Sequence, residues 1–541
     1  MVNADKSIKV DGLEKSIIDK CKQRIIAIAV IFFVSFIVVN IKLIDISKPL
    51  KAKEQTSINI QKSIKRGNIL DRNGNILAIS MPTWSLAKNR NIIFDIELTE
   101  KTILQILPNL DRIQLRKTLE SQQLEKIYIA RQLSPETAKK INKIGEPGIS
   151  FDPEDLRVYP YNDEISHIVG FTGTGKDGLA GIEKKYNDIL NNGNDIYLTL
   201  DSRVQYKIFN ILTKGIEVYK YKGAVGIVID VNTGELISGV SIPSFNPNGY
   251  HITEEPSRNQ ITASNFELGS VFKAITFASA LNDNIINLDS KFDATSPLKI
   301  GKYFIKDFHP ENRILSLEEV FIHSSNIGSA RIALELGKER QSYYFEKLGL
   351  KNKIDSGILE VEYPKYRRLD EVSDIHVANM SFGYGISVSP LNIISALAAT
   401  VNGGEYIQPY VVIDSKFINR PRVKVFTEKV SNIMKILYRS NVETGTAKNI
   451  KPIPYLVGGK TGTANKNENS KYMKKKVVSS LISFFPINNP RYALFVLVDE
   501  PKATGNIRGR TPGFNAVPLT KEIIMEIAPL LGQKSINKTE L

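Results

Sequence analysis

The chain has 541 residues, 42% hydrophobic and 24% charged, and its formal net charge is +15 at pH 7. This length suggests roughly three or four domain-sized units, and the composition is ordinary for a globular protein. The single cysteine, Cys21, excludes an intrachain disulfide, so the folded part must be held together by packing. No zinc-finger spacing, RNP-type aromatic motif or basic heptad region is present, so we expect no nucleic-acid partner. The positive charge indicates an anionic membrane surface, an acidic polymer or simply a basic surface.

A hydrophobic run near the N-terminus predicts one membrane-spanning helix at residues 25–44. Ile25 to Val39 carries no charge, and continuing to Ile44 gives about 20 residues, enough to cross ~30 Å of hydrocarbon. Basic residues precede the run, among them Lys15, Lys20, Lys22 and Arg24. By the positive-inside rule, residues 1–24 are expected in the cytoplasm and the bulk of the chain outside it. No small-x-small cleavage site follows, which favours a permanent anchor over a cleaved signal peptide.

Residues 45–195 are predicted to form a non-catalytic domain that follows the anchor. Asn73 and Gly74 lie between two short apolar pairs and indicate a hairpin, because both residues tolerate a positive φ. Residues 98–144 look mostly helical, with Ser134 as the N-cap of one helix. These features are architectural and carry no chemistry.

The histidines do not indicate a metal site. The chain has five of them, and none forms an HExxH pattern or a ligand cluster with cysteine. We interpret His167, in His167-Ile-Val-Gly170, as a structural residue at an interdomain contact. No cofactor and no metal ion are expected.

Residues 196–532 are predicted to form an α+β domain with an antiparallel sheet packed between helices. Strand-like runs occur before and after a long helical region. The four clearest runs are Ala224–Ile229, Leu236–Val240, Val478–Phe485 and Tyr492–Val498. The last residues, 533–541, are predicted to be a polar tail.

Ser270-Val-Phe-Lys273 is the first of three motifs that suggest acyl transfer at a serine. An SxxK pattern alone is weak, and it also occurs at Ser85, Ser296 and Ser535. Ser270 differs because Gly269 precedes it and an apolar, helix-forming stretch follows, so we predict that Ser270 opens a helix. Ser270 and Lys273 would then share one face. A serine needs a base, and a lysine can be that base if burial or a neighbouring cation lowers its pKa.

Ser324-Ser325-Asn326 is the second motif. Alone it would indicate an N-cap cluster, because it precedes a helix-forming stretch. Beside the first motif it predicts a proton-relay serine, Ser324, and an amide, Asn326, that orients the lysine or the substrate.

Lys460-Thr461-Gly462-Thr463 is the third motif, and it follows Gly458-Gly459. Glycine in an edge strand permits close approach of another backbone. Lys460 and the hydroxyls of Thr461 and Thr463 would bind a carboxylate, and the N–H groups of Ser270 and Thr463 would stabilise an oxyanion. The lysine-rich stretch 466–476 is predicted to be a solvated loop.

The three motifs, in this order, resemble the transpeptidase domain of penicillin-binding proteins. The stretches Arg66–Ala78, Arg157–Gly170 and Gly178–Tyr186 resemble the N-terminal pedestal of the class B, monofunctional group. Ser381–Pro390 and Asp499–Pro501 are more similar to the cell-division (FtsI-like) type than to the elongation type. Leu268 departs from the pattern, since the family usually has proline there.

The resemblance implies a membrane-anchored peptidoglycan D,D-transpeptidase of the inner membrane that acts in septal wall synthesis. Ser270 would attack a stem peptide ending in D-Ala-D-Ala, and an amine of a neighbouring stem would resolve the acyl-enzyme. β-Lactams would trap Ser270. The implied partners are an FtsW-type glycan polymerase and other divisome membrane proteins.

Three alternatives remain open at this point. An elongation-type transpeptidase has the same motifs. A serine β-lactamase would not need a pedestal and an anchor, and no clear deacylating glutamate element is found. A non-catalytic β-lactam sensor or divisome scaffold would have no reason to keep every catalytic group, and a sensor would be expected to have several membrane spans.

Overall fold

The computed structural model describes residues 12–47, 65–89, 93–123, 125–173, 176–249, 258–451, 453–468, 471–505 and 507–535. The chain divides into two compact units, Met1–Ile64 and Lys65–Leu541. Parts of the predicted cytoplasmic segment (1–11), the predicted pedestal (48–64) and the polar tail (536–541) lie outside the described residues.

The first unit contains a single described helix, α1 (Gly12–Ser47). Within its segment Ile17–Ile44 the most apolar 18-residue stretch has a mean hydropathy of 2.6, and none of that stretch is buried. The helix is therefore long and apolar enough to cross a membrane. It extends beyond both ends of the predicted span, because the polar residues that flank the apolar run are also helical.

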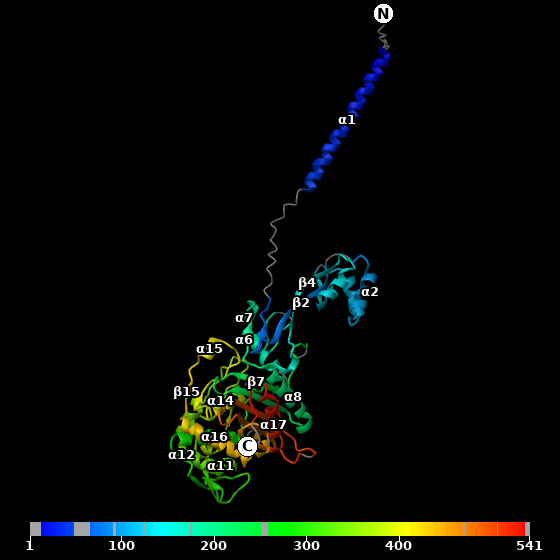
Figure 1. Ribbon diagram of the computed structural model, residues 1–541. Coiled ribbons are helices and arrows are strands. Elements are labelled where there is room, and N and C mark those ends of the chain that lie inside the picture. The colour runs from blue at the N-terminus through cyan, green and yellow to red at the C-terminus, as the bar shows by residue number, and fades with distance from the viewer. Residues whose placement is uncertain are drawn as a thin grey trace. The chain divides into compact units, whose positions relative to one another are not determined.

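The N-terminal part of the second unit combines a small sheet with short helices (Figure 1). In this sheet β3, β2, β1 and β5 are neighbours in that order, and β4 also pairs with β2. The elements are β1 (Ile69–Leu70), β2 (Ile76–Lys88), α2 (Ile96–Ile106), α3 (Arg112–Glu120), β3 (Ile127–Leu133), α4 (Pro135–Asn142), β4 (Ile149–Val158), η1 (Asn162–Glu164), α5 (Ser166–Val169), α6 (Gly181–Lys185), α7 (Asn187–Asn191) and β5 (Ile196–Tyr197).

The local predictions for this part were only partly right. The hairpin is confirmed, since β1 and β2 pair antiparallel, and Gly74 has a φ of +83°. Ser134 caps α4 through a hydrogen bond from Thr137 N, as predicted. The prediction of a mostly helical 98–144 is wrong at β3, where isoleucines alternate with other residues and the strand pairs with β2.

The C-terminal part of the second unit contains a five-stranded antiparallel sheet in the order β16-β17-β18-β6-β7. The elements that build or cover this sheet are α8 (Ser202–Tyr219), β6 (Gly223–Asp230), β7 (Leu236–Ile242), η2 (Gly269–Phe272), α10 (Lys273–Asn282), α11 (Leu317–Ile322), α12 (Asn326–Lys347), α13 (Asp374–Ser381), α14 (Pro390–Ala398), α16 (Glu428–Glu443), β16 (Gly458–Glu468), β17 (Lys471–Phe485), β18 (Tyr492–Asp499) and α17 (Ala516–Ile527). This part of the chain also contains short elements outside the five-stranded sheet, namely β8 (Lys291–Asp293), β9 (Leu298–Ile300), β10 (Tyr303–Ile305), β11 (Ile314–Ser316), β12 (Lys365–Tyr366), η3 (Leu369–Glu371), β13 (Ile386–Ser387), β14 (Glu405–Tyr406), α15 (Ser415–Ile418), β15 (Val423–Lys424), η4 (Lys448–Ile450) and η5 (Pro512–Phe514).

Both faces of this sheet are buried under helices, which confirms the predicted α+β architecture. Along β18, Leu494 and Val496 belong to one apolar cluster with residues of α8 and α17. Phe495 and Leu497 belong to the other cluster, with residues of α10, α11, α12, α14 and α16. Alternate side chains of β18 thus point to opposite faces of the sheet and belong to two apolar cores. In Figure 1, α8 and α17 lie apart from α11, α12, α14 and α16.

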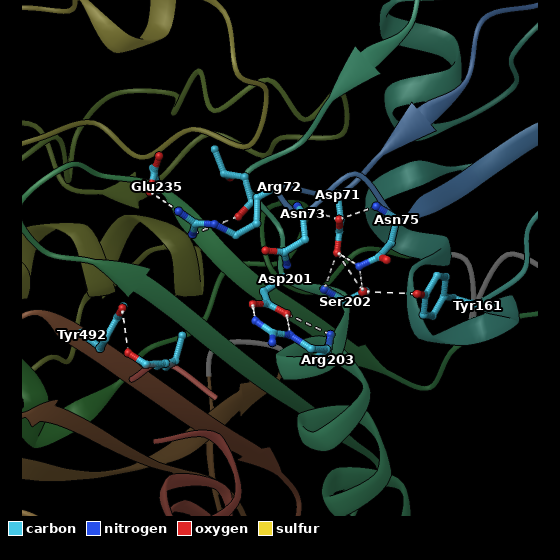
Figure 2. Close-up of polar contacts among 12 residues, drawn as sticks. Asp71, Arg72, Asn73, Asn75, Tyr161, Asp201, Ser202, Arg203, Glu235 and Tyr492 are labelled. Atoms are coloured by element: carbon cyan, nitrogen blue, oxygen red, sulfur yellow. Dashed lines mark hydrogen bonds and ion pairs between the residues drawn. The ribbon is translucent and has the colours of Figure 1, made fainter. Parts of the chain in front are cut away.

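Polar side chains of the β1–β2 turn contact the beginning of α8 (Figure 2). Asp71 accepts hydrogen bonds from Ser202 N at 3.2 Å and Ser202 Oγ at 2.8 Å. Arg72 pairs with Glu235, in the turn between β6 and β7, at 3.0 Å. Burial would raise the pKa of Asp71, but hydrogen bonds from Asn75 and Ser202 hold it below its ordinary value. These contacts join the two parts of the second unit, and the predicted boundary at residue 195 stays a prediction.

A cluster of buried ion pairs within the N-terminal part centres on Glu183, which is fully buried. Its carboxylate accepts hydrogen bonds from Arg66 Nε and Arg157 Nε, each at 2.7 Å. Glu183→Ala would leave two buried guanidinium groups without their anion, so we expect the free energy of unfolding to fall by about 3–5 kcal/mol in denaturant titrations. Glu136→Ala, which removes an exposed ion pair with Lys140, is the control and should cost less than about 1 kcal/mol. Equal effects of the two substitutions would contradict the prediction.

Candidate active site

The first motif lies where η2 passes into α10. Ser270 is in the 3-10 turn and Lys273 is the first residue of the α-helix, so the prediction that Ser270 opens a helix is right to within one turn. Ser270 is half-buried, and no hydrogen bond of its hydroxyl is recorded within the described part of the chain. Phe272 and Ala274 beside Lys273 are fully buried. The sequence thus places a partly accessible hydroxyl three residues before a lysine inside the core.

Two buried lysines converge on one serine. Lys273 and Lys460 are both 0% exposed. Lys273 Nζ donates to the carbonyl of Ser324 and lies 3.1 Å from Ser324 Oγ. Lys460 Nζ donates to the same Oγ at 2.9 Å. All three motifs therefore meet, although they come from α10, the loop before α12, and β16.

Burial changes the acid strength of both lysines. It lowers the pKa of Lys273 well below its ordinary value, and the nearby Lys460 lowers it further, while the charge of Asp307 acts in the opposite direction. Burial lowers the pKa of Lys460 to about 7. Burial and the charge of Lys460 both favour the neutral amine at Lys273, which is the form that a general base requires.

The second motif begins α12. Ser325 is the N-cap and accepts a hydrogen bond from Gly328 N at 3.0 Å. Ser324 has a φ of +59°, an uncommon value for a residue with a side chain. Asn326 Nδ2 donates to the Lys306 carbonyl at 2.9 Å, so this amide is engaged with the segment after β10 rather than with either lysine. Its predicted role toward lysine or substrate stays a prediction.

The third motif lies on β16, the edge strand of the sheet. Thr461 is buried, and its Oγ1 lies 2.6 Å from Thr446 Oγ1, so this hydroxyl is occupied by a neighbouring loop. Thr463 is half-buried. Its hydroxyl is the more accessible of the two predicted carboxylate ligands.

Three glycines allow the motifs to pack closely. A Cβ on Gly269, which has a φ of +60°, would lie 2.2 Å from Thr463 O, and one on Gly462 would lie 2.4 Å from Leu268 O. A Cβ on Gly383 would lie 2.3 Å from Gly269 O. The turn that carries Ser270 is thus held directly against β16 and against the segment after α13.

We expect Gly269→Ala to reduce the acylation rate by at least about 100-fold, because the added methyl must displace Ser270 or β16 by a large fraction of an ångström. Gly301→Ala is the matched control: Gly301 also has a positive φ, +57°, but no atom lies within 4 Å of its added Cβ. Stopped-flow measurement of penicillin acylation compares the two. Similar rates for both variants would show that close packing at Gly269 is not required.

The predicted solvated loop at 466–476 is wrong. β16 extends to Glu468 and β17 begins at Lys471, so this stretch belongs to a long hairpin. Lys466 pairs with Asp499 at 3.0 Å and Glu500 at 2.8 Å, and Lys476 pairs with Glu468. Lys466 and Lys476 are thus paired with carboxylates, whereas Lys471 and Lys475 are exposed.

Two of the other SxxK patterns, which the structure describes in full, do not form comparable sites. Ser85 and Lys88 lie on the strand β2, where Ser85 Oγ donates to Glu154 and Lys88 Nζ donates to the Asn89 carbonyl at 3.3 Å. Ser296 and Lys299 are exposed. Ser535 is described, but its partner residue 538 lies outside the described residues. His167 is buried and packs edge-on against Phe245, which fits its interpretation as a structural residue.

One residue near the motifs was missed. Asp307, after β10, accepts hydrogen bonds from Ser325 Oγ, Asn326 N and Ile327 N. A lone aspartate in a polar connection carries no sequence pattern that distinguishes it from a solvated residue, so only the folded chain reveals it.

Two family models match the chain. The penicillin binding protein transpeptidase domain matches residues 224–524, and the penicillin-binding protein dimerisation domain matches residues 61–199. The first covers more than half of the chain and contains all three motifs. This match defines the class of enzyme to which the sheet, its helices and the clustered motifs belong.

Curated relatives agree with this class. The chain is 35% identical to the probable peptidoglycan D,D-transpeptidase FtsI of Caulobacter vibrioides, over 88% of this chain and 82% of the relative. It is 27% identical to the FtsI of Escherichia coli K12 (84% and 82%) and 30% identical to the stage V sporulation protein D of Bacillus subtilis (89% and 81%). A peptidoglycan synthetase structure from Bifidobacterium adolescentis shares the fold, with a TM-score of 0.70 at 18% identity, over 88% of this chain and 97% of that one.

The chain therefore belongs to the penicillin-binding protein transpeptidase family, with the dimerisation and transpeptidase domains of the class B, FtsI-like group. It is an enzyme of the D,D-transpeptidase class.

Proposed function

We propose that the chain cross-links peptidoglycan stem peptides through an acyl-enzyme at Ser270. The observation that carries this proposal is the Ser324 hydroxyl held between the buried Nζ atoms of Lys273 and Lys460, next to the turn that carries Ser270. Relatives of similar length are named as peptidoglycan D,D-transpeptidases, which supports the choice of substrate.

The reaction would begin at Ser270. Neutral Lys273 takes the hydroxyl proton while Oγ attacks the carbonyl of the penultimate D-Ala. The N–H groups of Ser270 and Thr463 stabilise the developing oxyanion. The proton then passes through Ser324, which both lysines contact, to the nitrogen of the departing D-Ala. An amine of a second stem attacks the ester, loses its proton along the same route and restores Ser270.

Substrate recognition would use the edge strand β16. Lys460, when protonated, and the Thr463 hydroxyl bind the terminal carboxylate of the donor. Asn326 contacts the donor amide if its side chain leaves the Lys306 carbonyl. A β-lactam presents an equivalent carboxylate and acylates Ser270 in place of the stem peptide.

A fluorescent penicillin tests this activity against the β-lactamase alternative. We expect a covalent adduct that is hydrolysed only slowly, because no clear deacylating glutamate element is found in the sequence. Rapid hydrolysis of the drug with release of the free acid would favour a β-lactamase. No adduct at all would favour a non-catalytic scaffold.

We further infer a role in septal wall synthesis, with α1 as the anchor in the inner membrane, residues 1–24 in the cytoplasm and the catalytic part outside it. The FtsI-type relatives support this role, and an FtsW-type glycan polymerase and other divisome membrane proteins are the proposed partners. Depletion of the protein in cells tests it: filaments are expected, whereas rounded cells would support the elongation-type alternative.

A further inference from the structure

Asp307 lies outside the three motifs but contacts the second of them through three hydrogen bonds. Its Oδ2 accepts from Ser325 Oγ at 2.8 Å. Its Oδ1 accepts from Asn326 N at 2.5 Å and Ile327 N at 3.0 Å. A carboxylate is a strong acceptor for the free N–H groups at the beginning of a helix, and its charge is favourable there. Asp307 therefore fixes the first turn of α12.

The first turn of α12 sets the position of Ser324. Ser324 directly precedes the N-cap Ser325, and its φ of +59° has to be maintained by its surroundings. Its carbonyl and hydroxyl both contact Lys273 Nζ, and its hydroxyl contacts Lys460 Nζ. If the first turn moved, the distances from Ser324 to both lysines would change, so Asp307 acts on the site through Ser325 and Ser324.

The charge of Asp307 also acts on Lys273 directly. Among the described residues, the charged groups recorded as acting on Lys273 are Lys460, from β16, and Asp307, from the segment after β10. Lys460 and burial favour the neutral form of Lys273, and Asp307 favours the protonated form. Lys306 directly precedes Asp307 in the chain and His309 lies two residues after it. Asn326 Nδ2 donates to the Lys306 carbonyl.

We propose that Asp307 is a positioning residue for acylation, which holds Ser324 between the two lysines and supplies a negative charge close to Lys273. The proposal rests on the proposed function of Ser270 and Lys273. It does not require that Asp307 touch the substrate.

The charge is tested with Asp307→Asn, in which the amide oxygen can still accept from Asn326 N and Ile327 N. The acylation rate should rise with pH as Lys273 loses its proton. Without the negative charge that proton is lost at lower pH, so the acid limb of the rate profile is expected to move down by about half a pH unit or more. The measurement is the second-order rate constant for a fluorescent penicillin on the full chain, from pH 5 to 9.

Two further variants separate charge from hydrogen bonding. Ser325→Ala removes one partner of Asp307 but keeps the charge, so its acid limb should stay in place. Asp307→Ala removes both the charge and the hydrogen bonds. The maximal acylation rate of this variant should fall by about 10-fold or more because Ser324 is no longer fixed. Asp111→Asn, at the N-cap of α3 in the N-terminal part, is the control for the exchange itself and should leave the profile unchanged.

The outcomes distinguish failure of the proposed function from failure of the role of Asp307. A wild-type chain that is never acylated would refute the proposed function. A wild-type chain that is acylated, with an Asp307→Asn profile that superimposes on it, would refute the role of Asp307 alone. A limb shift in Asp307→Asn without one in Ser325→Ala supports the role, and melting temperatures close to wild type show that both variants fold.

Discussion

Ser270→Ala is expected to abolish covalent labelling by penicillin completely. The hydroxyl is the nucleophile, and alanine offers no atom that can form the ester. Ser270 is half-buried in a turn, so loss of its oxygen should leave the melting temperature within a few degrees of wild type. Gel fluorescence after incubation with a fluorescent penicillin measures the labelling.

The matched control for this substitution is Ser296→Ala. Ser296 belongs to another SxxK pattern, but it is exposed and lies outside the three motifs. Its loss should leave labelling at the wild-type level. Labelling that survives in Ser270→Ala and disappears in Ser296→Ala would place the nucleophile elsewhere.

Lys273→Ala is expected to slow acylation by about 100- to 10,000-fold, the usual contribution of a general base. Burial and the charge of Lys460 lower the pKa of Lys273, which favours the neutral form of the base in the wild type. Below that pKa the base is protonated, so the wild-type rate should fall as the pH is lowered. In Lys273→Ala this acid limb should disappear, because the group that produces it is gone.

The control for Lys273 is Lys299→Ala, from the exposed SxxK pattern at 296–299. It should leave both the rate and its pH profile unchanged. If Lys273→Ala folded and acylated at the wild-type rate at pH 7, Lys273 could not be the base. A folded state is verified by a melting temperature and a circular dichroism spectrum.

The sequence predicted best those features that depend on neighbouring residues. Ser270 and Lys273 are three apart, and an apolar stretch around Lys273 was sufficient to infer its burial, which the fold confirms at 0% exposure. The strands around Ala224 and Tyr492 were recognised from runs of β-branched and aromatic residues, because both faces of the sheet are buried.

The distances between residues that lie far apart in the chain were not predictable. The contact of one hydroxyl with two lysines requires that α10, the start of α12 and β16 converge, and no spacing in the sequence specifies those distances. The three close approaches at Gly269, Gly383 and Gly462 also arise only from tertiary packing. The same holds for Asp307.

The errors have physical causes as well. The stretch 466–476 was interpreted from its lysines alone, but Lys466 is neutralised by Asp499 and Glu500, which lie more than thirty residues later in the chain. β3 was assigned to a helix because the segments on both sides of it are helical. It forms a strand because it pairs with β2, which the local sequence does not indicate. Tertiary pairing outweighed local pattern in both cases.

The most direct test is to map the acyl group by mass spectrometry after the chain reacts with a D-Ala-D-Ala-terminated pentapeptide and is quenched in acid. Trypsin releases residues 259–273 as one peptide, which contains Ser264 and Ser270. We expect the mass of this peptide to increase by the mass of the donor minus one D-Ala. Fragment ions should place the acyl group on Ser270. An acyl group on Ser264 or on any other peptide, or none under conditions in which cross-linked product forms, would contradict it.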